Sequence, residues 1–390
     1  MGRRGSPRQA DAITDLRTLR GDSSDATETS NCQGMLFGTF RNQATETVML
    51  MRGSIIGLLM VGGIAIASAQ ERVVTLPGAS ATSNAEWLPA LSVQEQTTGN
   101  ADRMHPVLYV HGFTFPSVLS VFWKLDGRSW ADALNDAGYS VWGFDFAGFG
   151  GSERYPEMKD EMARVGPPLG GAAEGAEEIA RVVTYILAQT KATRVSIVAH
   201  SRGTIPAGIF ATQHPELVDR LVFFGPATQR QLEVLPDGLP SSTSALQQWR
   251  LVTAKNQQDR FVAEVPKGHD PVLLDRHFRP WARAYMATDP TSHMRDPNSV
   301  KVPNGPLADL IDAWRGKLAY DPAGIKSPLL IVRGEWDSLS NDSDAGWLLA
   351  AATSSPERRY LKIPEATHLM LLEEHRDDLH RATNKFLLGK

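Results

Sequence analysis

The 390-residue sequence contains a single cysteine, Cys32, so no disulfide can form within the chain. It also lacks a strong excess of charge, because 40 basic and 44 acidic residues leave a formal net charge of −4. A nearly balanced charge gives no electrostatic reason to expect a nucleic-acid partner. No internal repeat is visible, and no apolar run is long enough to cross a bilayer comfortably as a helix. These absences argue against a disulfide scaffold, a repeat array and a nucleic-acid-binding protein.

The chain does contain enough apolar material for a sizeable core. Hydrophobic residues make up 42% of it, which argues against global disorder. Its length suits one large domain with an insertion, or two domains.

Residues 49–69 have the layout of a secretory signal peptide. Arg52 supplies a positive start, residues 55–66 are apolar, and Ala67-Ser68-Ala69 offers a small-residue cleavage site before Gln70. The alternatives are a buried helix or an uncleaved anchor. We therefore expect an exported protein, periplasmic or secreted, with no stable membrane insertion after cleavage. Residues 1–48 are polar and aperiodic, and are expected to be disordered or an extension upstream of a true start at Met49 or Met51.

Apolar runs alternate with amphipathic segments through most of the remaining chain. Strands are expected at 105–112, 139–148, 194–201, 219–227, 327–336 and 358–364, and helices at 128–138, 171–190, 202–216 and 371–388. Alternating strands and helices predict an α/β fold, with a mostly parallel central sheet and helices on both faces. The two parts of this core are expected at 70–227 and 321–390.

Residues 228–320 interrupt the alternation with helical stretches and no convincing strand. We interpret them as an inserted helical cap over the strand ends. This segment holds Trp249, Trp281, Tyr285 and Met286 beside a cluster of basic residues, namely His269, Arg276, His277, Arg279 and Arg283. The basic cluster suits the steering of an anionic substrate, but the same pattern is typical of a solvated helix face.

Ser201 stands between an apolar strand and a helix, in the stretch SIVAHSRGT. It has Ala199 two positions before it and Gly203 two positions after it. A nucleophile on a sharp strand-to-helix turn requires small neighbours at these positions, because strand and helix approach closely. The pattern predicts that Ser201 is a nucleophile.

A serine hydroxyl needs a base, usually a histidine oriented by a carboxylate. Asp337 and His368 each follow a predicted strand, in the order nucleophile, acid, base. Three nearby carboxylates compete with Asp337 for the acid role, namely Glu335, Asp342 and Asp344. His111 and His200 are alternative bases, but His200 adjoins the nucleophile and His111 better suits the support of a neighbouring loop.

Taken together, the chain from about residue 75 to residue 390 resembles the serine hydrolases of the α/β-hydrolase fold, the esterase- and lipase-like family. The resemblance rests on His111-Gly112, the DFAGFGGS stretch from Asp145, Ser201, Asp337 and His368, which occur in the family's order. It implies a Ser201–Asp337–His368 triad, with an oxyanion hole formed by the backbone N–H groups of Phe113 and Arg202. Ala199 departs from the glycine that is usual at this position.

The expected activity is hydrolysis of a small-molecule carboxylic ester through an acyl-enzyme. The same residues also suit an amide or peptide, a lactone or a carbon–carbon bond, and a non-catalytic binding protein is a third interpretation. No cofactor or metal is expected, and the oligomeric state is not indicated. The Arg202 side chain is expected either to pair with a carboxylate, with Glu335 a candidate, or to reach the surface.

Overall fold

The computed structural model describes residues 69–79, 87–99, 101–236, 239–240 and 242–390. The chain divides into two compact units, Met1–Ala65 and Ile66–Lys390, and all described residues belong to the second unit. The predicted extension at 1–48 and the predicted signal peptide up to residue 68 therefore lie outside the described residues. Within the described ranges, no helix combines the length and the apolar character needed to cross a membrane.

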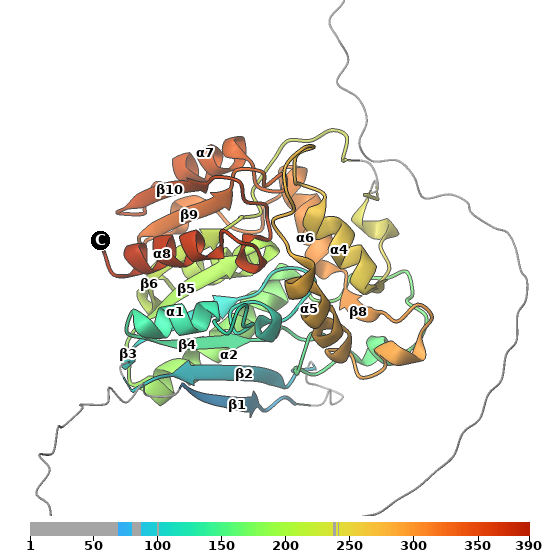
Figure 1. Ribbon diagram of the computed structural model, residues 1–390, viewed down its shortest axis with the longest axis horizontal. Helices are drawn as coiled ribbons and strands as arrows, with labels where there is room; N and C mark the ends of the chain where they lie inside the picture. The colour runs from blue at the N-terminus through green and yellow to red at the C-terminus, as the bar shows by residue number, and fades with distance from the viewer. Residues whose placement is uncertain (1–68, 80–86, 100, 237–238, 241) are drawn as a thin grey trace, which may run out of the picture. The chain divides into compact units, whose positions relative to one another are not determined.

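An eight-stranded sheet forms the centre of the second unit (Figure 1). In spatial order the strands are β1 (Gln70–Leu76), β2 (Leu91–Thr97), β4 (Tyr139–Phe144), β3 (Asp102–Val110), β5 (Val195–His200), β6 (Val218–Phe224), β9 (Leu329–Gly334) and β10 (Arg358–Ile363). The six strands from β4 to β10 run parallel, whereas β1 and β2 pair antiparallel. This arrangement confirms the predicted α/β fold class. The sequence analysis did not predict β1 and β2.

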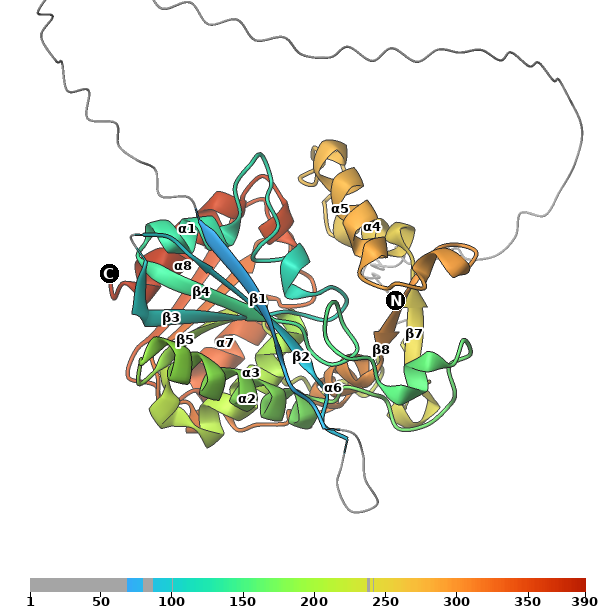
Figure 2. The same cartoon turned by 90° about the horizontal axis from the view of Figure 1, so that it is seen from below.

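Helices cover both faces of this sheet, as predicted. Figure 2 shows α1 (Trp130–Asp136) and α8 (Arg376–Leu387) on one face, with α2 (Ala172–Thr190) and α3 (Thr204–Gln213) on the other. Helix α7 (Asp342–Ala351) connects β9 to β10. The apolar stripe of α2 is buried, since Ile179, Val182, Val183 and Ile186 have no exposed surface. Both β4 and β5 are buried along their whole length, which is usual for parallel strands covered on both faces.

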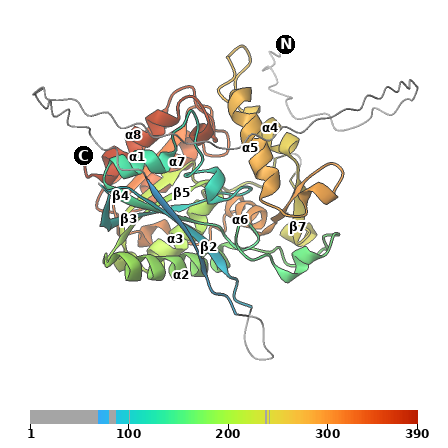
Figure 3. The same ribbon diagram turned by 60° about the horizontal axis from the view of Figure 1, so that its bottom comes forward.

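The inserted segment, residues 228–320, follows β6 and precedes β9 in the chain. In space it lies beyond one end of the strands (Figures 1 and 3). It contains α4 (Ala254–Val262), α5 (Asp275–Ala287) and α6 (Gly305–Trp314). It also contains a small antiparallel sheet of β7 (Trp249–Val252) and β8 (Val300–Pro303), where the sequence analysis expected no strand. Strands of four residues are too short to show a clear alternation, which explains the difference.

Candidate active site

Ser201 lies immediately after β5, on a single 3-10 turn, Ser201–Gly203, that leads into α3. Its backbone φ of 57° falls in the left-handed region, which a non-glycine residue adopts at a cost of about 1–3 kcal/mol. Strain of this kind persists only where the surrounding structure enforces it. The sharp turn that the sequence predicts is therefore present at Ser201.

The loop after β3, residues 111–116 (the β3 loop), packs tightly against this turn. Strands β3 and β5 are parallel neighbours, with Val110 opposite Ala199. A Cβ atom added to Gly203 would lie 2.3 Å from the carbonyl oxygen of His111, and one added to Gly112 would lie 3.1 Å from the Cβ of Ser201. Only glycine fits the approach at position 203, and the approach at position 112 is tight. The backbones of the β3 loop and the Ser201 turn therefore lie side by side.

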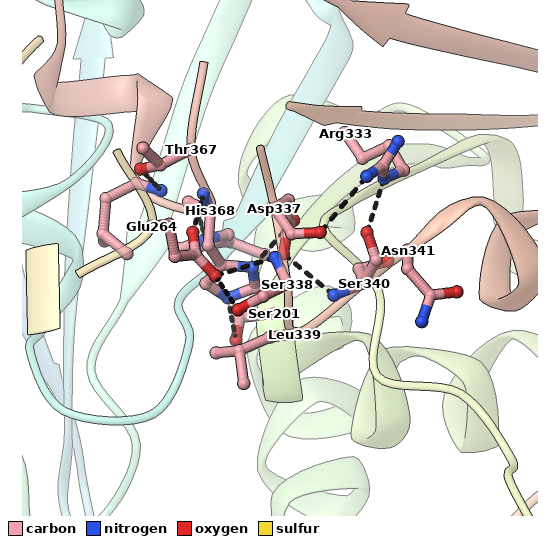
Figure 4. Close-up of polar contacts among 12 residues, drawn as sticks. Ser201, Glu264, Arg333, Asp337, Ser338, Leu339, Ser340, Asn341, Thr367 and His368 are labelled. Atoms are coloured by element: carbon pink, nitrogen blue, oxygen red, sulfur yellow. Dashed lines mark hydrogen bonds and ion pairs between the residues drawn. The ribbon is translucent and has the colours of Figure 1, made fainter. Parts of the chain in front are cut away.

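Ser201, His368 and Asp337 form a continuous hydrogen-bonded row (Figure 4). The Oγ of Ser201 lies 2.7 Å from Nε2 of His368, and Nδ1 of His368 lies 2.9 Å from Oδ2 of Asp337. The three residues follow β5, β10 and β9, respectively, and both His368 and Asp337 are buried. The structure thus brings together the three side chains that the sequence predicts, across residue separations of 167 and 31.

Burial and charge act in opposite directions on His368. Burial lowers the pKa of its imidazole, the Asp337 carboxylate raises it, and the net pKa is raised above the usual value. The other carboxylate oxygen of Asp337 accepts the backbone N–H of Ser340 at 2.8 Å. A carboxylate held at Nδ1 keeps the proton on that nitrogen, so the lone pair of Nε2 faces the Ser201 hydroxyl.

The loop after β9, residues 335–341 (the β9 loop), is held by Arg333 and Glu264. The Arg333 guanidinium donates to the carbonyl oxygens of Glu335 and Asp337, each at 3.2 Å. Glu264, from the inserted segment, accepts the backbone N–H groups of Ser338 and His368, each at 2.8 Å (Figure 4). Sequence reasoning missed both residues. The contact of Glu264 with His368 spans 104 residues and leaves no local pattern, and the contacts of Arg333, although local, follow no helix or strand period.

The competing carboxylates all have other partners. Glu335 accepts the backbone N–H of Glu365 at 3.2 Å, Asp342 binds Arg333 at 2.8 Å, and Asp344 binds Arg230. Of the carboxylates that follow β9, Asp337 is the one that hydrogen-bonds His368.

His111 and His200 each form hydrogen bonds with backbone groups and not with Ser201. Nε2 of His111 accepts the N–H of Phe146 at 3.1 Å, and its Nδ1 bonds the carbonyl of Gly112 at 3.0 Å. Burial lowers the pKa of His111 to about 3, so the ring is neutral. Nε2 of His200 bonds the carbonyl oxygen of His368 at 3.1 Å, and burial lowers its pKa as well. His111 therefore supports the β3 loop, as the sequence analysis expected.

The Arg202 side chain is buried and hydrogen-bonded. Its Nε donates to Asp309 at 2.8 Å, and its Nη2 donates to the carbonyl of Gly170 at 2.7 Å. The expected carboxylate partner is thus present, but the candidate Glu335 is wrong. Asp309 lies on α6, which packs beside the Ser201 turn, whereas Glu335 follows β9, two strands away from β5.

Two members of the basic cluster predicted on the inserted segment, Arg279 and His277, have acidic partners. Arg279 is exposed and pairs with Asp275 one turn away, and His277 bonds Asp126 at 3.0 Å. This agrees with a solvated helix face for Arg279. Within the part of the chain that the structure describes, no group of three or more His, Cys, Asp or Glu residues is arranged to hold a metal ion.

The comparisons with known proteins agree with this geometry. A family model described as the alpha/beta hydrolase fold matches residues 105–375, more than half of the chain. A 2-hydroxy-6-oxo-6-phenylhexa-2,4-dienoate hydrolase from Rhodococcus sp. strain RHA1 is 13% identical, with a TM-score of 0.54, covering 83% of this chain and 100% of that one. A serine hydrolase from the polyaromatic hydrocarbon-degrading bacterium Cycloclasticus zankles is 15% identical, with a TM-score of 0.51 and coverage of 82% and 99%. Such low identities show a shared fold, and no curated protein matches the chain.

Proposed function

Because the chain belongs to the α/β-hydrolase fold family, we propose that it is a serine hydrolase that cleaves carboxylic esters. The observation that carries this proposal is the row of Ser201, His368 and Asp337, with contacts of 2.7 and 2.9 Å. The strained backbone at Ser201 adds support, because it marks the turn on which such nucleophiles stand.

In the proposed reaction, Ser201 Oγ attacks the acyl carbon while His368 Nε2 takes its proton. Asp337 stabilises the imidazolium that forms, and His368 then gives the proton to the leaving alcohol. Water attacks the resulting acyl-enzyme, assisted again by His368, and the acid is released. Each protein group returns to its starting state, so no cofactor is needed.

The developing negative charge on the carbonyl oxygen requires donors, and we assign these to the backbone N–H groups of Phe113 and Arg202. Arg202 directly follows the nucleophile, and Phe113 directly follows Gly112, whose backbone lies against Ser201. Arg202 contributes only its backbone here, because its side chain is bound to Asp309. Removal of one such donor typically costs about 10²–10³ in kcat.

Turnover of p-nitrophenyl esters tests the bond type. We expect hydrolysis of at least one of the acetate, butyrate and octanoate esters, and loss of that activity after treatment with an organophosphonate. Mass spectrometry should place the phosphonyl adduct on Ser201, since His368 activates that hydroxyl. Labelling of Ser201 without ester turnover would indicate that the enzyme cleaves an amide, a lactone or a carbon–carbon bond instead. Absence of both would refute a serine hydrolase.

We also propose that the protein is exported, through cleavage before Gln70. This position suits the fold, because β1 begins at Gln70 and cleavage there removes no described strand or helix. N-terminal sequencing of the protein from its native cells is expected to begin at Gln70. Recovery of a chain that begins at Met1, Met49 or Met51 would contradict this.

A further inference from the structure

Two arginines of the inserted segment lie against the β3 loop, beside the proposed oxyanion donors. The guanidinium carbon of Arg250, on β7, lies 4.3 Å from the centre of the Phe113 ring. The Nη2 of Arg260, on α4, donates to the Thr114 hydroxyl and to the side-chain oxygen of Gln257, each at 2.9 Å. The inserted segment thus places two positive charges against Phe113 and Thr114, the two residues that follow Gly112.

Neither positive charge has an acid as its direct partner in the part of the chain that the structure describes. In the described residues, Arg250 donates to the neutral amide of Asn304, the hydrogen-bond partners of Arg260 are also neutral, and neither guanidinium forms an ion pair. Burial lowers the pKa of each to about 10, which leaves both cationic at neutral pH. An enclosed charge without a counter-ion is costly, so a fold that keeps two of them side by side requires a reason.

The same cluster contains buried polar atoms that lack a partner. In the described part of the chain, the Nε of Arg260, the amide nitrogen of Gln257 and the hydroxyl of Tyr285 are buried and have no hydrogen-bond partner outside this cluster, where Gln257 and Tyr285 lie against each other. Gln257 is 1% exposed and Tyr285 has no exposed surface. Buried donors normally have acceptors, and unpaired donors beside two cations suit an anionic ligand. Arg250 and Arg260 are themselves partly exposed, as access by a ligand requires.

Glu264 acts on Arg260 through its charge but forms no ion pair with it. Glu264 follows the end of α4, and its two oxygens accept from Ser338 and from the backbone of His368. Arg260 is also close to the triad. Burial has the largest effect on the pKa of His368, and the charge of Arg260 adds to that lowering. Arg260 also binds Thr114 of the β3 loop, which packs against the Ser201 turn, so a ligand at the cluster lies near Ser201.

We propose, on the basis of the ester hydrolysis proposed above, that Arg250, Gln257, Arg260 and Tyr285 form a subsite for a carboxylate. The preferred substrate is then an ester that carries a free carboxylate elsewhere in its acyl or alcohol part. That carboxylate supplies the counter-ion of both arginines and accepts from the unpaired donors. Neither arginine belongs to the basic cluster expected from the sequence, and both adjoin the β3 loop.

Two pairs of chromogenic esters that differ only in charge test the preference. Mono-p-nitrophenyl glutarate and its methyl ester vary the acyl part, and 4-acetoxybenzoate and its methyl ester vary the alcohol part. In at least one pair, kcat/KM is expected to be about 10-fold or more higher for the charged ester. Arg250→Met and Arg260→Met should each reduce that advantage about 10- to 100-fold, whereas Arg260→Lys should retain part of it. Arg279→Met, at an exposed position of α5, is the matched control and should leave the ratio unchanged.

Three results would overturn the subsite: a wild-type enzyme that prefers the neutral ester in both pairs, equal losses on charged and neutral esters, or the same ratio in Arg260→Met as in the wild type. Binding of glutarate, measured by calorimetry, tests the subsite independently of ester hydrolysis. Ester turnover without glutarate binding would refute the subsite alone. Glutarate binding that Arg260→Met weakens about 10-fold or more, in a protein that cleaves none of the four esters, would support the subsite and refute ester hydrolysis.

Discussion

Replacement of Ser201 by alanine is expected to lower kcat by about 10³- to 10⁶-fold while leaving the fold intact. The hydroxyl lies 2.7 Å from Nε2 of His368, and its loss removes the atom that attacks the acyl carbon. Some catalysis should remain, because the oxyanion donors and the binding pocket still favour the transition state. Steady-state hydrolysis of the best p-nitrophenyl ester measures the loss, and circular dichroism measures the fold.

The matched control for this variant is Ser354→Ala, which removes an exposed hydroxyl after α7. It should retain wild-type kcat, since Ser354 is exposed and forms no hydrogen bond with a residue of the row in the part of the chain that the structure describes. Wild-type activity in Ser201→Ala would mean that another group is the nucleophile. Unfolding of Ser201→Ala would instead be visible as a lost thermal transition, so the two explanations can be separated.

Replacement of Asp337 by asparagine is expected to lower kcat by about 10⁴-fold. The amide is isosteric with the carboxylate, but it neither stabilises the imidazolium nor keeps the proton on Nδ1 of His368. The Nε2 lone pair would then no longer face Ser201 in most molecules. The hydrogen bond from Ser340 can still be accepted by the amide oxygen, so the β9 loop should keep its conformation.

The same variant should also change the pH dependence of the residual activity. His368 works as a base when neutral, so activity falls as the pH drops through its pKa. Burial lowers that pKa and Asp337 raises it, with a net rise. Without the carboxylate the pKa falls, and the acidic limb of kcat/KM should move to lower pH. An unchanged limb would show that Asp337 does not set the charge of His368.

The control for the acid is Glu335→Gln, since Glu335 is the nearest competitor in the sequence. Its carboxylate accepts from the backbone of Glu365 and does not bond His368, so only a few-fold loss is expected. A loss in Glu335→Gln as large as that in Asp337→Asn would overturn the assignment of the acid.

Local patterns in the sequence were sufficient to predict the central fold. The apolar run before Ser201 forms β5, and the stripe of Ile179, Val182, Val183 and Ile186 forms the buried face of α2. Such patterns report the period of an element and the side that it buries, and both depend on neighbouring residues. Four strands escaped prediction, namely β1, β2, β7 and β8. Strand β1 is largely exposed, and β7 and β8 are too short to show a period.

The sequence by itself determined the strand–turn–helix around Ser201 and the chain order of Ser201, Asp337 and His368. Only the tertiary structure decided which carboxylate faces His368, that Arg202 binds Asp309, and that Arg250 and Arg260 adjoin the β3 loop. The physical reason is distance along the chain: these contacts join residues up to 146 positions apart. Strand order and packing create such contacts, and no pattern of neighbouring residues contains that information.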